Sequence, residues 1–176
     1  MVNIQHLASL EANSAKLAEL LINTVDSNAS IGFTAPVFQA TAVAYWANVA
    51  AQIAAGEKHL IAAFCNEQLV GAVQLSLCTK ENGRHRAEIE KLMVHSDYRQ
   101  QGIAQQLMRA AESLAVSEHI SLLVLDTRAG DKAEPLYHKL GYVEAGKIPH
   151  FTQNQTGVFE ATVIFYKQLT PELCAV

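Results

Sequence analysis

The six residues from Arg99 to Ala104 (RQQGIA) have the composition of an anion-binding turn. An apolar stretch that ends at Val94 predicts a buried strand before them, and the pattern of residues 105–117 predicts a helix after them. At such a junction the first backbone N–H groups of the helix have no partner, and the helix dipole adds positive potential. The segment therefore predicts a binding site for a phosphate group.

The kind of phosphate ligand is not set by the turn alone. The sequence contains neither G-x-x-x-x-G-K-[ST] nor G-x-G-x-x-G, the two common nucleotide-binding patterns. An ordinary strand–helix connection that contains one glycine is the alternative interpretation. The residues around the turn are needed to distinguish a phosphate-binding site from such a connection.

The composition excludes several other classes of function. The 176 residues carry a formal net charge of -4, so no basic field is available to attract nucleic acid. No apolar run is long enough to span a bilayer, and residues 1–10 lack the features of a signal peptide. Cys65, Cys78 and Cys174 show no metal-binding spacing, and we expect reduced thiols, no metal and a cytoplasmic protein.

The order of elements predicts one domain, residues 1–176, with a mixed α/β fold. Helices are predicted at 15–25, 40–55, 105–117 and 132–140. Strands are predicted at 2–7, 59–65, 68–78, 87–94, 120–125, 142–145 and 158–166. The passage 87–126 forms a right-handed βαβ unit, so its two strands are parallel, and the other strands are antiparallel. The loop 31–37 joins two helices, and we expect it to border the strand ends and to set substrate specificity.

The strand before the turn has an irregular apolar pattern. Ile89 is odd-numbered, whereas Leu92 and Val94 are even-numbered, so strict alternation would put them on opposite faces. A β-bulge within residues 91–93 would bring them to one face and leave a backbone N–H unpaired.

Two motifs resemble those of the GCN5-related N-acetyltransferase (GNAT) family, and the resemblance spans residues 59–167. The turn resembles the family's acetyl-CoA motif R/Q-x-x-G-x-G/A, with Arg99, Gly102 and Ala104 at its defining positions. Residues 133–142 (AEPLYHKLGY) resemble a second signature, A-x-x-L-Y-x-K-L-G-F/Y. One departure is Gly130, which stands where the family often has an asparagine that contacts CoA.

The resemblance implies a mostly antiparallel sheet with a central parallel pair, helices on both faces and acetyl-CoA as cosubstrate. It also implies that the unpaired N–H of the bulge, here that of Met93 or Val94, polarises the thioester carbonyl. The residues expected to contact acetyl-CoA are Leu92, Met93, Val94, Arg99, Gln100, Gln101, Gly102, Ile103, Ala104 and Gln105.

Several further segments resemble the tabtoxin-resistance acetyltransferases within this family. These segments are 30–33, 74–78, 82–83, 86–88, 125–127 and 129–130. The closer resemblance implies a small-molecule partner, the primary amine of an amino-acid-like toxin or antibiotic. A protein or peptide N-acetyltransferase and an acyl-CoA sensor without turnover remain as alternatives.

Acetyl transfer to an amine needs a base for the ammonium and an acid for the departing thiolate. The candidate bases are Glu88, Glu90 and Asp126, and the tabtoxin-resistance branch matches Glu88 and Asp126. Strand geometry makes it difficult for both to reach one nitrogen, so a water relay, or one base with one anchor for the ammonium, is expected. Tyr137 is the candidate acid. The alternatives are a solvated strand face for Glu88 and Glu90, a turn cap for Asp126 and a core ring for Tyr137.

Phe33 and Glu90 are the expected contacts of the substrate. Phe33, Phe38, Tyr45 and Trp46 either line a pocket or pack in the core. The alanine-rich helices leave a homodimer open, although no residue pattern specifies one.

Overall fold

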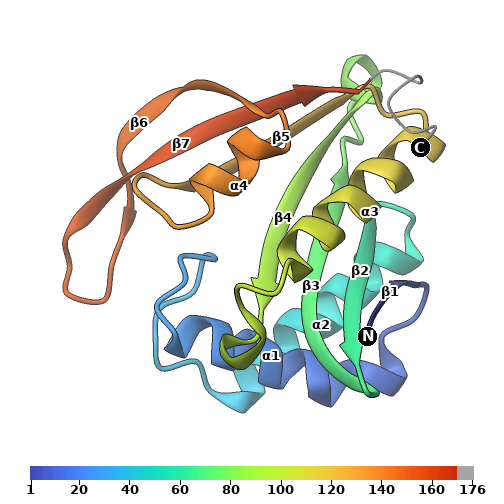
Figure 1. The fold of residues 1–176 in the computed structure, drawn as a ribbon, viewed down its shortest axis with the longest axis vertical. Helices are drawn as coiled ribbons and strands as arrows, with labels where there is room; N and C mark the ends of the chain where they lie inside the picture. The colour runs from blue at the N-terminus through green and yellow to red at the C-terminus, as the bar shows by residue number, and fades with distance from the viewer. Residues whose placement is uncertain (170–176) are drawn as a thin grey trace.

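The computed structural model describes residues 1–169, which form one mixed sheet with helices on both faces (Figure 1). The strands are β1 (Val2–Leu7), β2 (Lys58–Cys65), β3 (Gln68–Leu77), β4 (Arg86–Val94), β5 (Leu122–Arg128), β6 (Val143–Gln153) and β7 (Phe159–Gln168). The helices are α1 (Ser14–Asp26), α2 (Gln39–Ala54), α3 (Ile103–Ser117) and α4 (Glu134–Lys139). The strand order is β1-β2-β3-β4-β5-β7-β6, and within this part of the chain β4 and β5 form the parallel pair among antiparallel neighbours. The predicted fold class is confirmed.

Two apolar clusters hold the layers together. α1 and α2 pack on one face of the sheet, and α3 and α4 cover the other (Figure 1). On the first face Leu17 and Trp46 are buried, and the Trp46 indole N–H donates to the Leu17 carbonyl at 2.9 Å. On the second face Leu107 and Phe165 are fully buried. The two helical layers therefore fix the sheet from both sides and leave its strand ends free to form a site.

The parallel strands β4 and β5 pair over only three residues and then separate. The pairs run from Arg86 opposite Leu122 to Glu88 opposite Val124. Beyond these pairs β4 and β5 separate, as Figure 1 shows. The space between them is bordered by the carboxyl ends of two parallel strands, which is a common position for a ligand in α/β sheets.

The predicted bulge in β4 is confirmed. Met93 pairs with Ala72 and Glu90 pairs with Gln74, so that two residues, Lys91 and Leu92, lie opposite Val73. Lys91 has a φ of 51°, a left-handed conformation that is uncommon outside glycine. The extra residue places Ile89, Leu92 and Val94 on the α3 side of the sheet, as the irregular apolar pattern predicted.

Several predicted boundaries differ from the structure, and two of them bear on the site. Asp126 does not end β5, because β7 continues to pair with it and with the next two residues up to Arg128. β6 does not end at residue 145 but runs to Gln153, and the chain reverses between β6 and β7. Its side chains are mostly exposed on both faces, so the apolar alternation that would have marked a longer strand is missing.

Within residues 1–169 no helix is both long and apolar enough to cross a membrane. No group of three or more His, Cys, Asp or Glu residues in this range is placed to hold a metal ion. Cys65 and Cys78 are free thiols, and Cys174 lies outside the described residues.

Candidate active site

The predicted anion-binding turn lies between β4 and α3. Gln100 and Gly102 have φ angles of 61° and 77°, and α3 begins directly afterwards at Ile103. A Cβ atom added at Gly102 would meet no other atom within 4 Å, so the backbone there faces open space. The first N–H groups of a 15-residue helix are thus available to an anion, and the residues present fit a phosphate group.

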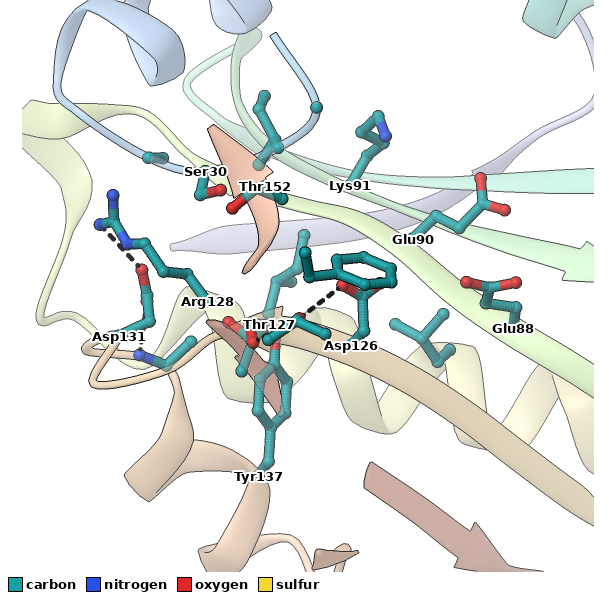
Figure 2. A pocket seen from close by; sticks show the side chains of 18 residues that line it. Ser30, Glu88, Glu90, Lys91, Asp126, Thr127, Arg128, Asp131, Tyr137 and Thr152 are labelled. Carbon is teal, nitrogen blue, oxygen red and sulfur yellow. Dashed lines mark hydrogen bonds and ion pairs between the residues drawn. The ribbon is translucent and has the colours of Figure 1, made fainter. Parts of the chain in front are cut away.

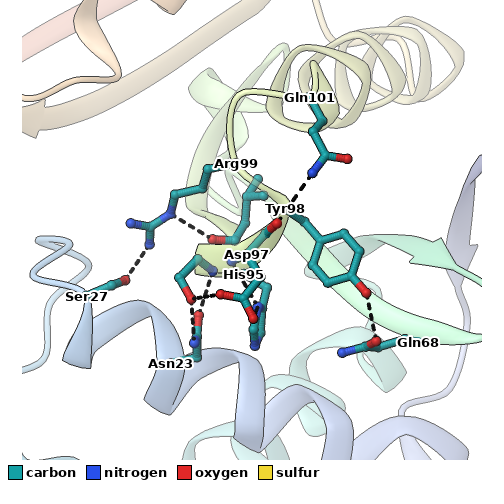
Figure 3. Close-up of polar contacts among 10 residues, drawn as sticks. Asn23, Ser27, Gln68, His95, Asp97, Tyr98, Arg99 and Gln101 are labelled. Atoms are coloured by element: carbon teal, nitrogen blue, oxygen red, sulfur yellow. Dashed lines mark hydrogen bonds and ion pairs between the residues drawn. The ribbon is translucent and has the colours of Figure 1, made fainter.

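The start of the turn is held from two sides (Figure 3). The side chain of Asn23 on α1 accepts a hydrogen bond from the Ser96 backbone N–H at 2.9 Å, and its amide donates to the Ser96 hydroxyl at 3.1 Å. The Tyr98 hydroxyl donates to Gln68 on β3 at 2.9 Å. These contacts fix the turn against α1 and β3, so the N–H groups that follow are placed before a ligand arrives.

Arg99 bridges the end of β4 and the end of α1 (Figure 3). Its Nε donates to the Val94 carbonyl at 3.2 Å, and its guanidinium also donates to the Ser27 hydroxyl. The guanidinium therefore lies beside the turn with its positive charge directed along the opening between β4 and α1.

A cavity of about 370 Å³ extends from the turn toward the separated strands, and we call it the turn cavity. Of the residues expected to contact acetyl-CoA, those that line it are Leu92, Val94, Arg99 and Ala104. Gly130 lines it as well. The side chains of Met93 and Ile103 are buried in the core, so only their backbone groups are available to a ligand. Gln100, Gln101 and Gly102 lie in the turn, and Gln105 lies in the first turn of α3.

A second cavity, of about 390 Å³, lies between β4 and β5, and we call it the acidic cavity (Figure 2). It contains four residues predicted to act in the site, Glu88, Glu90, Asp126 and Tyr137. The two cavities share lining residues, among them Leu92 in the bulge. A ligand in the turn cavity and one in the acidic cavity can therefore meet at the bulge.

Glu88 and Asp126 enter the acidic cavity from neighbouring strands. Glu88 lies opposite Val124 in the parallel ladder, so Asp126 lies two residues further along β5. Partial withdrawal from water raises the pKa of Glu88, and the negative charges of Glu90 and Asp126 raise it further. The Asp126 carboxylate lies 2.9 Å from the hydroxyl of Thr162, which is itself 2.8 Å from the Thr127 carbonyl. Because a hydroxyl has a single proton, Thr162 can donate to one of these two acceptors at a time.

Glu90 lines the acidic cavity and forms an ion pair with Lys58, which lies outside it. Its carboxylate lies 2.7 Å from the ammonium of Lys58, a side chain that is buried in the sheet. Lys58 also donates to Gln74 at 3.1 Å, and the amide of Gln74 donates to the Tyr45 hydroxyl at 2.8 Å. Burial raises the pKa of Tyr45 to about 12, so this network is held together by a neutral phenol, an amide and one ion pair.

Tyr137 combines a packed ring with a hydroxyl that faces the cavity. Its ring lies against Tyr142 and Phe165, with centroids 6.0 and 5.7 Å away. Figure 2 shows the side chain directed from α4 toward Thr127 and Asp126. Burial raises the pKa of Tyr137 well above its usual range, with a smaller contribution from Asp131 and then Asp126. The group therefore stays protonated and able to donate.

Two cations of the acidic cavity were not among the predicted site residues. Lys91 lies in the bulge beside Gly32, and its ammonium has no hydrogen bond or ion pair with another residue of the described chain. Burial lowers its pKa. Arg128 lies 3.4 Å from Asp131 and 3.6 Å from Glu160, so its charge is already matched. The predicted bulge at 91–93 could have indicated that Lys91 belongs to the site. No sequence feature indicated Arg128, because β5 was expected to end before it.

The predicted specificity loop lies beside the site, but Phe33 does not line the acidic cavity. Ser30, Ile31 and Gly32 do line it. Phe33 packs edge-on against Tyr45, with ring centroids 5.2 Å apart, and borders a smaller cavity of about 200 Å³ near the β6–β7 turn. The loop therefore borders the strand ends as predicted.

The fold is similar to that of solved structures. One is a ribosomal-protein-alanine N-acetyltransferase from Brucella melitensis, with 22% identity, a TM-score of 0.78 and coverage of 95% of this chain and 99% of that chain. Another is YncA from Salmonella typhimurium with its cofactor acetyl-CoA, at 17% identity, a TM-score of 0.78 and coverage of 97% and 95%. A third is a ribosomal-protein-alanine N-acetyltransferase from Escherichia coli, at 19% identity, a TM-score of 0.71 and coverage of 97% and 95%. Residues 34–154 match the family model of the acetyltransferase (GNAT) domain, and the chain accordingly belongs to this family of acetyl-CoA-dependent acetyltransferases.

Proposed function

We propose that this enzyme transfers acetyl to the primary amine of a small molecule that also carries an anionic group, such as an amino-acid-like toxin or antibiotic. The observation that carries the proposal is the charge pattern of the acidic cavity. Carboxylates of Glu88 and Asp126 are placed to attract an ammonium. The ammonium of Lys91, which has no ion pair within residues 1–169, is placed to attract an anion. The resemblance of several sequence segments to the tabtoxin-resistance acetyltransferases supports the same class of substrate.

The size of the cavity supports a small acceptor. At about 390 Å³ it lies near the lower end of the range for small-molecule sites. Phe151 and Thr152 of β6 form part of its wall, and Ser30 to Gly32 of the loop form another part. An acceptor enclosed in this way is held with its amine near the bulge, where the two cavities meet.

The donor side is formed by the turn and the bulge. The N–H groups at the start of α3 would hold the pyrophosphate of acetyl-CoA, and Leu92 and Val94 would line the path of its pantetheine arm. When bound, acetyl-CoA supplies a thioester carbonyl carbon for attack by the amine and a thiolate as leaving group. The backbone N–H of Met93 or Val94 is proposed to donate to the carbonyl oxygen as negative charge develops there.

The proton transfers are assigned to Glu88 and Tyr137. An aliphatic ammonium has a pKa near 10, so a carboxylate must take its proton before the nitrogen lone pair is free. Glu88 suits this step, because its raised pKa increases its affinity for a proton. Tyr137 donates its proton to the departing sulfur, and its phenolate is neutralised by the proton that the new amide nitrogen releases.

Lys91→Met tests the proposed substrate class. With an amino acid as acceptor, we expect KM to rise by about ten-fold or more, the cost of one lost ion pair of about 1.4 kcal/mol. With the corresponding decarboxylated amine, KM should change little. Lys147→Met is the matched control, because Lys147 is an exposed lysine on β6 outside both cavities. Equal effects of Lys91→Met on the two acceptors would exclude Lys91 as the anion site.

Peptide amines are the second candidate class, because two similar structures are ribosomal-protein-alanine N-acetyltransferases. A panel of short peptides in the same assay separates the two classes. The proposal requires kcat/KM for the best small amine to exceed that for every peptide by about ten-fold, or 1.4 kcal/mol in transition-state binding. A peptide that is acetylated faster than all small amines would replace the small-molecule proposal.

A further inference from the structure

Lys58 is a buried cation that lies outside both cavities. Only 9% of its side chain is exposed, and it reaches from β2 across β3 toward β4. Removing a cation from water is unfavourable unless it is paired and hydrogen-bonded. Lys58 has both kinds of partner, Glu90 at 2.7 Å and Gln74 at 3.1 Å. Lys58 therefore lies outside the acidic cavity but contacts Glu90, one of the residues that line it.

Glu90 connects this network to the cavity. Its carboxylate contacts Lys58 on one side, and 27% of the side chain remains exposed on the other. The Lys58 ammonium, at 2.7 Å, makes a charge-assisted hydrogen bond with this carboxylate. One side of the Glu90 carboxylate is therefore already occupied by a cation.

Glu88 has a different environment. No ion pair holds its carboxylate among the described residues. The charged groups around it are Glu90, Asp126, Lys58 and Lys91, and on its other side Arg86 and Cys78 line a separate cavity with it. The balance of burial and these charges raises the pKa of Glu88. Two acids of the same type, two residues apart on one strand, thus differ in their partners: Glu90 is held in an ion pair with Lys58, whereas Glu88 lines the acidic cavity without one among the described residues.

We propose that Lys58 is a positioning residue of the acetyl transfer: its ion pair holds the Glu90 carboxylate, so that the proton of the acceptor ammonium passes to Glu88. The inference rests on the proposed function, because it assigns the proton acceptor of that reaction. The proton leaves the ammonium nitrogen and joins a Glu88 oxygen, while Glu90 and Lys58 keep their charges. Lys58 itself contacts neither substrate.

Two variants test this proposal, because they are expected to shift the acid limb of the pH profile of kcat/KM in opposite directions. Lys58→Met removes a positive charge near Glu88, so the acid limb of the kcat/KM profile should move to higher pH. Glu90→Gln removes a negative charge, so the same limb should move to lower pH. Lys58→Arg keeps the positive charge and should leave the limb near its wild-type position. A role limited to stability would lower the activity of both variants without moving the limb in opposite directions.

Lys167→Met is the matched control for loss of a partly buried ion pair. Lys167 lies 2.8 Å from Glu112, and both side chains are at most 15% exposed, on the sheet face that α3 covers. This control should lower the thermal unfolding temperature without moving the acid limb. If Lys58→Met does not fold, the other two variants still test the proposal. The acid limb of the kcat/KM profile should move to lower pH in Glu90→Gln and stay near its wild-type position in Lys58→Arg, and any other result would overturn the proposal.

A titration of the Glu88 carboxyl carbon by ¹³C NMR, in protein without acetyl-CoA or acceptor, separates this inference from the proposed function. The pKa of Glu88 should rise in Lys58→Met and fall in Glu90→Gln even if the acceptor is a different amine from the one proposed. Shifts in the same direction, or in neither variant, would overturn the role of Lys58. Failure to acetylate any small amine, with the opposite NMR shifts present, would overturn the proposed function alone.

Discussion

Glu88 and Asp126 lie on neighbouring parallel strands and differ by two positions in register, since Glu88 is opposite Val124. At about 3.3 Å per residue, this offset separates their backbones by roughly 7 Å along the strands. One carboxylate is therefore better placed to accept the proton of the acceptor ammonium. The other is placed to attract the ammonium and so to position the acceptor. Glu88 has the raised pKa, and Asp126 is held by Thr162.

Substitution of the two acids should produce different kinetic changes. Glu88→Gln should lower kcat/KM by about 10²- to 10⁴-fold, the usual contribution of a general base. Asp126→Asn should mainly raise the KM of the acceptor and move the acid limb to lower pH, because Asp126 raises the pKa of Glu88. The measurement is a pH–rate profile for each variant. An unchanged kcat/KM in both would remove these residues from the mechanism.

Glu88→Gln should also stabilise the fold near neutral pH. A carboxyl whose pKa is higher in the folded state binds its proton more tightly there, so the native state loses stability as pH rises above the ordinary Glu value of about 4.3. The variant has no such group. Thermal unfolding should show a gain in the variant at pH 7 that disappears by about pH 4. A gain of equal size at both pH values would mean that Glu88 acts on stability through packing.

Tyr137→Phe should lower kcat with little change in the KM of acetyl-CoA. The substitution keeps the ring against Tyr142 and Phe165 and removes only the hydroxyl. We expect a decrease of about 10²-fold, at the lower end for loss of a general acid. Because the pKa of Tyr137 is raised, its ionisation should not appear as an alkaline limb in the working pH range. A lowered unfolding temperature with unchanged kcat would assign Tyr137 to the core.

Gly102→Ala tests the anion-binding turn. The φ of 77° is unfavourable for alanine by about 1 kcal/mol, and relaxation would turn the first N–H groups of α3 away from the pyrophosphate. The KM of acetyl-CoA should rise by about five- to ten-fold while kcat changes little. Gly56→Ala is the control, with a φ of 71°, open space around its added Cβ and a position after α2 outside the site. Equal effects of the two substitutions on KM would show only backbone strain.

The sequence predicted the turn and the bulge better than the arrangement of the acidic cavity. The turn at 99–104 and the bulge are local features, and their residue types and apolar pattern suffice to locate them. The position of Glu88 relative to Asp126 depends on strand register, which the parallel pairing fixes only once the fold is formed.

Other parts of the site depend on contacts between distant segments. Lys58 is separated by 32 residues from Glu90, and no local pattern distinguishes it from a solvated lysine. Phe151 and Thr152 reach the cavity because β6 continues to Gln153, and an edge strand exposed on both faces has no apolar alternation to reveal its length. Arg128 was missed because β7 extends β5 beyond the predicted end at Asp126.

The most direct test of the proposed function is the release of CoA from acetyl-CoA with a panel of amines, comprising amino acids, amino-acid-like toxins, their decarboxylated amines, polyamines and peptides. The wild-type enzyme should acetylate a small amine that carries an anionic group faster than every other member of the panel. Glu88→Gln should reduce that rate by about 10²-fold or more. Tight binding of acetyl-CoA with no turnover on any amine in the panel would contradict the proposed function and favour an acyl-CoA sensor.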